Sequence, residues 1–302
     1  MMRLAAEDAA PGDPGDSPAA LATFQRERGR LFGIAYRMLG SVREAEDVLQ
    51  DAYLRWHGVD HAAVTHPPAY LAQLVTRLCL DALKSAHARR VEYYGVWLPE
   101  PLVGAADDDP AAMHELAEDL SLAFLLMLER LTPVERAVFL LRESFVFSHR
   151  EVAEVVGKSE DNCRQIERRA RRHLAEAKRP APADPAEHDR LLASFLTAIR
   201  DGDVEGLLEV LAEDAVAYSD GGGRVLAARN PIRGADKVAR FFVGITSKGG
   251  SEWEARLVPV NGRTGMVGLV EGHPQGVLSI EVEDGRIRSV YLVVNPDKLP
   301  PG

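Results

Sequence analysis

Polar side chains that can bind DNA bases gather in one stretch of the chain, residues 158–172. An Arg side chain can make two parallel hydrogen bonds to guanine, and Asn or Gln can do the same with adenine. Further Arg residues would contact phosphates, which adds affinity without sequence information. The stretch therefore predicts a DNA-reading surface made of Lys158, Ser159, Asn162, Arg164, Gln165, Arg168, Arg169, Arg171 and Arg172.

Two short helices joined at a glycine would position these side chains. Ser148 and Glu151 have the spacing of a capping box at the start of a short apolar helix, which Gly157 would end. A second helix would begin after Ser159 and bury the stripe Cys163, Ile166, Ala170, Leu174 and Ala177. This pattern predicts a helix-turn-helix, whose second helix reads bases in the major groove. The alternative is an ordinary helical hairpin with a basic, solvated outer face.

The net charge of the chain, −10 over 302 residues, by itself argues against a nucleic-acid partner. The charge is unevenly distributed, because residues 131–179 carry +3 whereas residues 1–130 carry −8 and residues 180–302 carry −5. A phosphate backbone responds mainly to charges within a Debye length of about 10 Å. A local basic surface on an acidic protein is therefore compatible with DNA binding.

Composition excludes several other classes of protein. Cys79 and Cys163 are the only cysteines and both lie in helix-like contexts, which excludes a disulfide-stapled secreted module. No apolar run is long enough to span a bilayer, and no secretion signal is visible. No metal-ligand cluster is apparent. We therefore expect a cytoplasmic protein with reduced thiols, no membrane association and no cofactor.

Segments rich in proline and glycine divide the chain. We expect a disordered tail at residues 1–20, a helical domain at 21–95, a linker at 96–115, the helix-turn-helix domain at 116–179, a linker at 180–186 and a third domain at 187–302. The third domain begins with helical patterns and continues with strand patterns separated by turn residues, which predicts antiparallel strands in a curved sheet wrapped on helices. The predicted fold class is thus two all-α domains followed by an α+β domain.

Two parts of the chain resemble bacterial sigma-70-family factors of the extracytoplasmic-function (ECF) type. Residues 32–56, FGIAYRMLGSVREAEDVLQDAYLRW, are similar to the second conserved region of that family, and residues 131–174 are similar to the fourth. The string WLPEP at 97–101 is typical of a subfamily that carries a SnoaL-like, NTF2-like cone domain at its C-terminus. That subfamily also has a DGGGK-like corner, here with Arg224 in place of Lys, and an NPDKL-like end.

The resemblance implies a sigma factor that is monomeric when free, binds the β′ clamp and the β flap of core RNA polymerase, and recognises promoter DNA. The implied polymerase-binding residues are Glu46, Asp47, Asp51, Arg55 and Trp56. Those implied for the promoter −10 element are Arg77, Lys84, His87, Arg89 and Arg90, and the DNA-reading surface would bind the −35 element. Without the surrounding motif, the acidic residues Glu44, Asp47 and Asp51 would read as a solvated helix face.

The resemblance further implies that the C-terminal domain regulates the sigma domains in cis. The implied regulatory or interdomain residues are Trp97, Leu98, Pro99, Asp220, Gly221, Gly222, Gly223, Arg224, Asn295, Pro296, Asp297, Lys298 and Leu299. The glycine corner is also compatible with a simple tight turn.

Two other functions remain open at this point. A ligand-sensing helix-turn-helix regulator would use a small molecule in the apolar pocket of the C-terminal domain. A SnoaL-like cyclase or isomerase would use acid-base residues there, and the candidates are Asp214, Tyr218, Asp220 and His273. No spacing among these four residues forces a catalytic pairing, so we expect no enzymatic activity.

Overall fold

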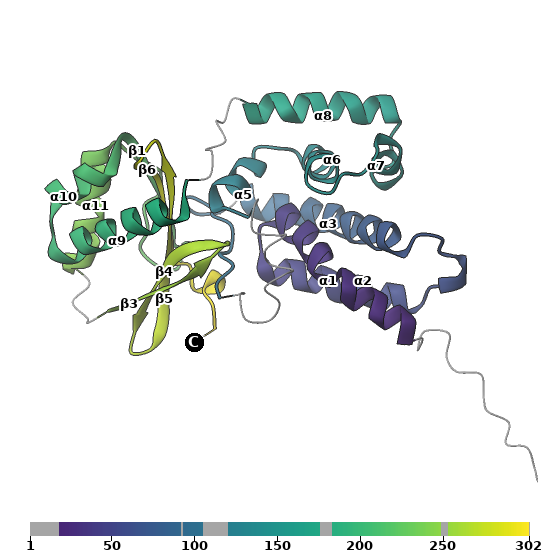
Figure 1. Cartoon of the computed structure of the whole chain (residues 1–302), viewed down its shortest axis with the longest axis horizontal. Helices are drawn as coiled ribbons and strands as arrows, with labels where there is room; N and C mark the ends of the chain where they lie inside the picture. Colours follow the sequence, from purple (N-terminus) through teal and green to yellow (C-terminus); the bar gives the residue numbers. More distant parts are fainter. Residues whose placement is uncertain (1–17, 92, 105–119, 176–182, 249–252, 302) are drawn as a thin grey trace, which may run out of the picture.

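The computed structural model describes residues 18–91, 93–104, 120–175, 183–248 and 253–301, with the backbone alone described for residues 85–91 and 248. Two helical domains lie at one end of the molecule and an α+β domain lies at the other (Figure 1).

The first domain is a bundle of three long helices with one short 3-10 helix in its second connection. Its elements are α1 Pro18–Leu39, α2 Val42–His57, η1 His61–Ala63 and α3 Pro67–Val91. Gly40, at a φ of 68°, ends α1, and the Ser41 hydroxyl then caps α2 by accepting from the Glu44 N–H. Helix α1 already begins at Pro18, so the tail that we expected to reach residue 20 is too long by three residues. Proline suits a first helical turn because its missing N–H is not needed there.

The second domain is the predicted helix-turn-helix with two preceding helices. Its elements are α5 Leu122–Leu128, α6 Pro133–Glu143, α7 His149–Val156 and α8 Glu160–Ala175. The capping box of Ser148 and Glu151 is present, and Gly157 ends α7 in the left-handed conformation at a φ of 66°. Both features confirm the local prediction. Residues 116–119, the expected start of this domain, lie outside the described residues.

The third domain packs helices on one face of a six-stranded sheet. Its elements are α9 Pro185–Asp201, α10 Val204–Val210, β1 Leu211–Asp220, β2 Ile232–Arg233, α11 Ala235–Lys248, β3 Glu254–Val260, β4 Arg263–Val270, β5 His273–Glu283, β6 Arg286–Val293 and η2 Pro296–Lys298. The strand order is β2-β1-β6-β5-β4-β3. Strands β3 to β6 form the expected antiparallel meander. Strand β1 instead pairs with β6 in parallel, because the chain between them passes through α11 and the whole meander rather than through a hairpin.

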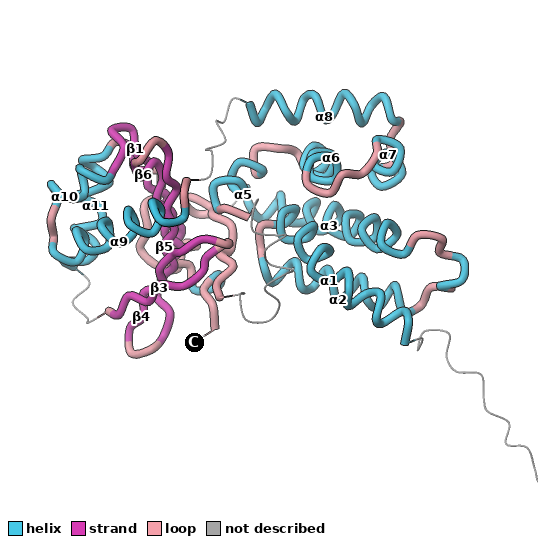
Figure 2. The backbone as a smooth tube through the Cα atoms, in the orientation of Figure 1, coloured by secondary structure: helices cyan, strands magenta, loops and turns pink. Residues whose placement is uncertain are grey.

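Both faces of this sheet are covered. Helices α9, α10 and α11 enclose the core of the domain on one face, where Phe195 and Phe242 meet edge to face at 5.2 Å. On the other face, Tyr291 and Val293 join the core that runs through the two helical domains. In Figure 2 the strands accordingly lie between α9–α11 and the helical end of the molecule. One face of the sheet therefore packs against the helices of its own domain, and the other face packs against the two helical domains.

The part of the chain that the structure describes contains neither a membrane-spanning helix nor a disulfide bond. No helix there is both long and apolar enough to cross a membrane. Both cysteines, Cys79 and Cys163, are free and buried.

Candidate DNA, polymerase and interdomain sites

The DNA-reading surface lies on α8 and the turn before it, and all nine of its residues are exposed. Three of its arginines are engaged in ion pairs. Arg164 pairs along α8 with Glu160 and Asp161, with N···O distances of 3.1 and 2.7 Å. Arg169 and Arg171 bind acidic residues of α6, namely Glu135 and Glu143, and Arg171 also binds Glu167 within α8.

The ion pair between Arg169 and Glu135 joins α8 to the capped start of α6. Glu135 is 2% exposed and closes the capping box of α6 with Thr132. Burial opposes its ionisation, but hydrogen bonds from Thr132 and from Arg169 outweigh burial, so the pKa of Glu135 lies below its usual value. By contrast, the exposed Arg168 and Arg172 make no ion pair or hydrogen bond within the described residues. They are the guanidinium groups most available to phosphates.

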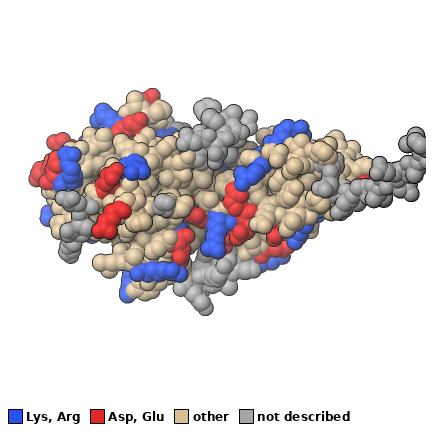
Figure 3. Space-filling model, turned by 90° about the horizontal axis from the view of Figure 1, so that it is seen from below, with Lys and Arg blue, Asp and Glu red and all other residues tan. Residues whose placement is uncertain are grey.

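The acidic face of α2 presents Asp47, Asp51 and Arg55 to solvent, together with Leu54, which is 62% exposed. Glu46 beside them is paired with Arg28 of α1 at 2.7 Å. Figure 3 shows the molecule from below, with small mixed groups of acidic and basic side chains and no continuous basic surface on that face.

Trp56, implied as a polymerase contact, lies in the core. It is 2% exposed, and its indole N–H donates to the carbonyl of Ala20 at 3.0 Å. Trp56 therefore holds the start of α1 against α2, and its ring is not available on the outer face of the helix.

The residues implied for the −10 element differ in how exposed they are and in what they bind. The Arg77 guanidinium donates to the carbonyls of Glu154 at 2.8 Å and Val155 at 3.4 Å, at the C-terminal end of α7. A cation at this end also interacts favourably with the helix dipole. Lys84 pairs with Asp81 on the exposed side of α3 at 2.7 Å. The side chains of His87, Arg89 and Arg90 lie outside the described part of the structure.

Other arginines also join the two helical domains. Arg136 of α6 is 3% exposed, donates to the Met38 carbonyl at 2.7 Å and pairs with Glu129 at 2.7 Å. In addition, two arginines of α1 stack on phenylalanines of the loop between α6 and α7, each at 5.4 Å from the ring centre: Arg30 on Phe147 and Arg37 on Phe145. The helix-turn-helix domain is thus packed directly on the first domain.

Asp220, at the end of β1, is the centre of the contact between the C-terminal domain and the linker. It is fully buried, and its carboxylate accepts four hydrogen bonds. The donors are the Tyr93 hydroxyl at 2.5 Å, the Leu98 N–H at 2.8 Å, the Gly222 N–H at 3.0 Å and the Lys298 ammonium at 2.8 Å. We call these five residues the Asp220 clasp. The bond to Gly222 is the turn-forming role expected from sequence, and the other three reach into the linker and the C-terminal end.

Aromatic rings and an amide complete the surroundings of the clasp. Lys298 also donates to the Leu98 carbonyl at 2.6 Å and lies over the rings of Trp97 and Tyr93, 4.4 and 5.0 Å from their centres. The Asn295 amide donates to the Tyr93 hydroxyl at 2.9 Å. Burial and the neighbouring Asp220 carboxylate raise the pKa of Tyr93, so this hydroxyl remains a donor at neutral pH.

Two positions of the glycine corner, Gly221 and Gly222, have no room for a side chain. A Cβ at Gly222, whose φ is 62°, would lie 2.5 Å from the Asn295 side chain, and a Cβ at Gly221 would lie 2.4 Å from the Val225 carbonyl. Arg224 pairs with Asp297 at 3.1 Å on the surface. Arginine in the place of the usual lysine thus still links the corner to the NPDKL segment.

A second polar joint, at Asn261, was not predicted from the sequence. Its amide group donates to the Tyr36 hydroxyl at 2.8 Å and to the Leu120 carbonyl at 2.9 Å, and it accepts from the Leu102 N–H at 3.1 Å. Tyr36 in turn donates to the Glu100 carbonyl at 2.6 Å. One side chain of the C-terminal domain thereby holds the first domain and both ends of the interdomain segment. The only local signal was the turn dipeptide Asn261-Gly262, which says nothing about distant partners.

The four acid-base candidates do not form a catalytic group. Asp214 pairs with Arg288 on the surface at 3.0 Å, and His273 is exposed at the start of β5. Tyr218 stacks on Tyr291 with ring centres 5.3 Å apart, while Asp220 is committed to the clasp. Within the described ranges, no group of His, Cys, Asp and Glu is arranged to hold a metal ion.

Two helical domains, one with a helix-turn-helix, followed by an α+β domain are an architecture typical of multidomain DNA-binding regulators. Residues 23–90 match the family model for Sigma-70 region 2, and residues 121–174 match the model for Sigma-70, region 4. The chain belongs to the extracytoplasmic-function sigma factors, which are transcription initiation factors and not enzymes.

Relatives from Mycobacterium tuberculosis extend the similarity to the C-terminal domain. The chain is 37% identical to the ECF RNA polymerase sigma factor SigJ over 286 residues, or 91% of each chain. It is 32% identical to the probable ECF RNA polymerase sigma factor SigI, over 93% of this chain and 94% of that one. The crystal structure of SigJ matches with a TM-score of 0.75 at 34% identity, over 92% of this chain and 97% of the other. A regulator or an enzyme that lacks the sigma regions is therefore excluded.

Proposed function

We propose that this sigma factor binds core RNA polymerase through the exposed face of α2 and through the helix-turn-helix domain, which we expect to contact the β′ clamp and the β flap respectively. Region 2 would recognise the −10 element and α8 the −35 element. The free protein would be monomeric and cytoplasmic, and the C-terminal domain would hold it in a closed, inactive arrangement.

The Asp220 clasp is the observation that carries the regulatory part of the proposal. It attaches the C-terminal domain to the linker between the two sigma regions, and it uses a buried carboxylate that is costly to leave unpaired. In the same arrangement Arg77, a −10 candidate, is bound to the end of α7. Promoter binding by both regions would therefore require the closed arrangement to open.

Transcription reconstituted with core polymerase tests this proposal. Wild-type protein should confer initiation at its own promoter, and Asp220→Asn should raise the rate of initiation at limiting protein concentration. The matched control is Asp236→Asn, which removes an exposed ion pair with Arg240 within α11 and should leave initiation unchanged. Equal activity of Asp220→Asn and wild type would contradict regulation through the clasp.

The role of α8 can be tested by the salt dependence of promoter binding in holoenzyme. Arg168→Ala and Arg172→Ala should each weaken binding and reduce the slope of log affinity against log salt by about one, because one phosphate contact is lost. Arg164→Ala should instead change the preferred sequence if that residue reads a base. A salt slope that neither Arg168→Ala nor Arg172→Ala alters would exclude these two residues as phosphate contacts.

A further inference from the structure

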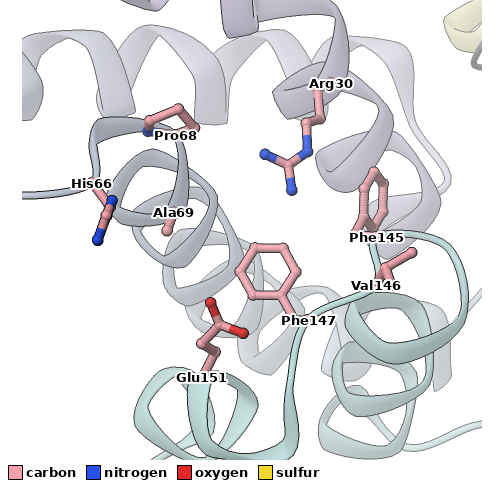
Figure 4. Close-up of a pocket in the computed structure, with 8 residues that line it drawn as sticks. All are labelled: Arg30, His66, Pro68, Ala69, Phe145, Val146, Phe147 and Glu151. Atoms are coloured by element: carbon pink, nitrogen blue, oxygen red, sulfur yellow. The ribbon is translucent and has the colours of Figure 1, made fainter.

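A groove of about 400 Å³ lies between the two helical domains. Its walls come from α1, from the start of α3, from the loop between α6 and α7, and from α7 itself (Figure 4). This volume is within the range of small-molecule sites in proteins. The promoter and polymerase surfaces described above do not account for it.

The floor of the groove is apolar and held in place. Phe147 is 4% exposed, and its backbone N–H donates to the Leu141 carbonyl at 2.9 Å. Phe145 lies beside it on the same loop, and Pro68 lies across the groove at the start of α3. Val146 at the rim is 83% exposed and has a φ of 57°, a conformation that is costly for a β-branched residue. The surrounding contacts therefore impose one shape on this loop.

A positive group lies at one end of the floor. The Arg30 guanidinium stands over the Phe147 ring at 5.4 Å and points into the groove in Figure 4. Its salt-bridge partner is Glu27, one turn away on the same helix, at a long N···O distance of 3.6 Å. Because a guanidinium has five N–H donors in a planar fork, Arg30 can still bind a carboxylate with two parallel hydrogen bonds.

A negative group lies at the other end. Glu151 accepts from the N–H and the hydroxyl of Ser148, at 2.7 and 2.6 Å, through its Oε2 atom. These bonds hold its pKa below the usual value, so the carboxylate is charged at neutral pH. Its other oxygen, Oε1, makes no hydrogen bond to the described residues and can accept one from a ligand.

We propose that this groove binds a small aromatic molecule that carries a carboxylate at one end and an amino group at the other. The carboxylate would bind Arg30, the ring would lie against the half-buried Pro68 and Phe145, and the amino group would donate to Glu151. A plain aromatic acid would leave Glu151 facing an apolar edge, and a plain amine would leave Arg30 unused. The pair of opposite charges thus selects a ligand with a carboxylate at one end and a hydrogen-bond donor at the other.

Such a ligand would bind only while the two helical domains are together, because Arg30 belongs to the first domain and Glu151 and Phe147 belong to the second. Binding would stabilise the closed arrangement by mass action. An effect on transcription rests on the proposed function, whereas binding itself does not.

Binding is tested on the free, full-length protein, without polymerase, by calorimetric titration with aminonaphthoic acid as the probe. We expect saturable binding of one molecule per chain. Naphthoic acid and methyl aminonaphthoate, which lack the amino group and the free carboxylate respectively, should each bind about tenfold more weakly, as expected for the loss of one charged hydrogen bond. This comparison needs no variant and is unaffected by any folding defect. Absence of saturable binding, or equal binding of the ester and the acid, would overturn the proposal.

Variants then locate the site. Arg30→Gln should abolish the preference for the acid over its methyl ester, and Glu151→Gln should abolish the preference for the amino compound. Gln at position 151 can still serve the capping box. Arg26→Gln is the matched control, since Arg26 lies one turn earlier on α1 with a side chain that is 67% exposed, and should bind the probe like wild type. If Arg30→Gln keeps the wild-type preference, the probe binds elsewhere and the proposal fails.

Discussion

The ammonium of Lys298 lies 2.8 Å from the carboxylate of Asp220, and this carboxylate has no exposed surface. A buried ion pair is stabilising only if further hydrogen bonds satisfy both groups. Here Tyr93, Leu98 and Gly222 donate to the acid, while the Leu98 carbonyl accepts from the amine. The clasp therefore depends on all of its members at once.

Replacement of Asp220 by Asn should lower the free energy of unfolding by about 3 kcal/mol, because Lys298 loses its counter-ion in a largely buried position. Urea unfolding measures this change. Asp297→Asn should cost less than about 1 kcal/mol, since its pair with Arg224 is exposed. Equal losses in both variants would show that the clasp contributes no more than a surface pair.

Replacement of Asn261 by Ala should destabilise the protein by about 2 kcal/mol, because buried partners on Tyr36, Leu102 and Leu120 lose their hydrogen bonds. Asn261 has a φ of 51°, so part of the loss in the Ala variant is backbone strain. Asn261→Gly separates the two effects, because glycine relieves the strain and still removes the hydrogen bonds. If the Gly variant were as stable as wild type, strain alone would explain the Ala result.

Glu281 of β5 is predicted to oppose stability at neutral pH. It is 8% exposed, and burial raises its pKa despite a hydrogen bond with Ser121 and the nearby charge of Arg263. A raised carboxyl pKa means that the folded protein binds more protons than the unfolded chain, so stability falls as pH rises above the unfolded pKa of about 4.3. Glu281→Gln should therefore raise the unfolding free energy at neutral pH, because the amide carries no charge that burial opposes.

The pH dependence provides the control for Glu281. Near pH 4, where the wild-type carboxyl is already protonated, the gain in Glu281→Gln should disappear. A loss of stability at neutral pH would mean that the attraction to Arg263 outweighs burial.

His188 of α9 should make the protein less stable in mild acid. The residue is 1% exposed, its Nε2 contacts the Thr264 carbonyl at 2.8 Å, and its Nδ1 is buried with no partner among the described residues. Burial lowers the pKa of His188, so the unfolded chain binds more protons below its own pKa of about 6.5. The contribution of His188 to stability is complete above that value and is lost as the pH falls below it.

Urea unfolding of wild type and His188→Gln at pH values on both sides of about 6.5 measures this effect. The variant should lose less stability than wild type between the two conditions, because its side chain does not titrate. Parallel pH profiles for the two proteins would rule out His188 as the source of the acid sensitivity.

Local features of the fold could be predicted from the sequence because each depends on neighbouring residues. The capping box at Ser148 and Glu151, the turn at Gly157 and the antiparallel meander all follow from spacing along the chain. The parallel pairing of β1 with β6 could not be predicted this way, since it depends on the path of the chain between the two strands.

The interdomain contacts were the least predictable part of the candidate site. A family resemblance identifies the WLPEP and NPDKL motifs as interdomain residues. No sequence pattern indicates that Asp220 accepts a hydrogen bond from the Tyr93 hydroxyl, which lies 127 positions earlier. Tyr36 and Asn261 were missed because a buried hydrogen bond between domains has no local signature. The family motif names Trp56 among the implied polymerase-binding residues but does not give the direction of its ring, which lies in the core.

The sequence separation within the clasp has a consequence for protein synthesis. Lys298 binds the carbonyl of Leu98, which is 200 residues earlier in the chain. Domains fold as the N-terminal parts leave the ribosome, so both sigma domains can be complete well before Lys298 is translated. During that interval the nascent chain has both helical domains but lacks the complete clasp. The clasp is thus completed late in synthesis, only when translation has passed residue 298, and the proposed closed arrangement would form no earlier.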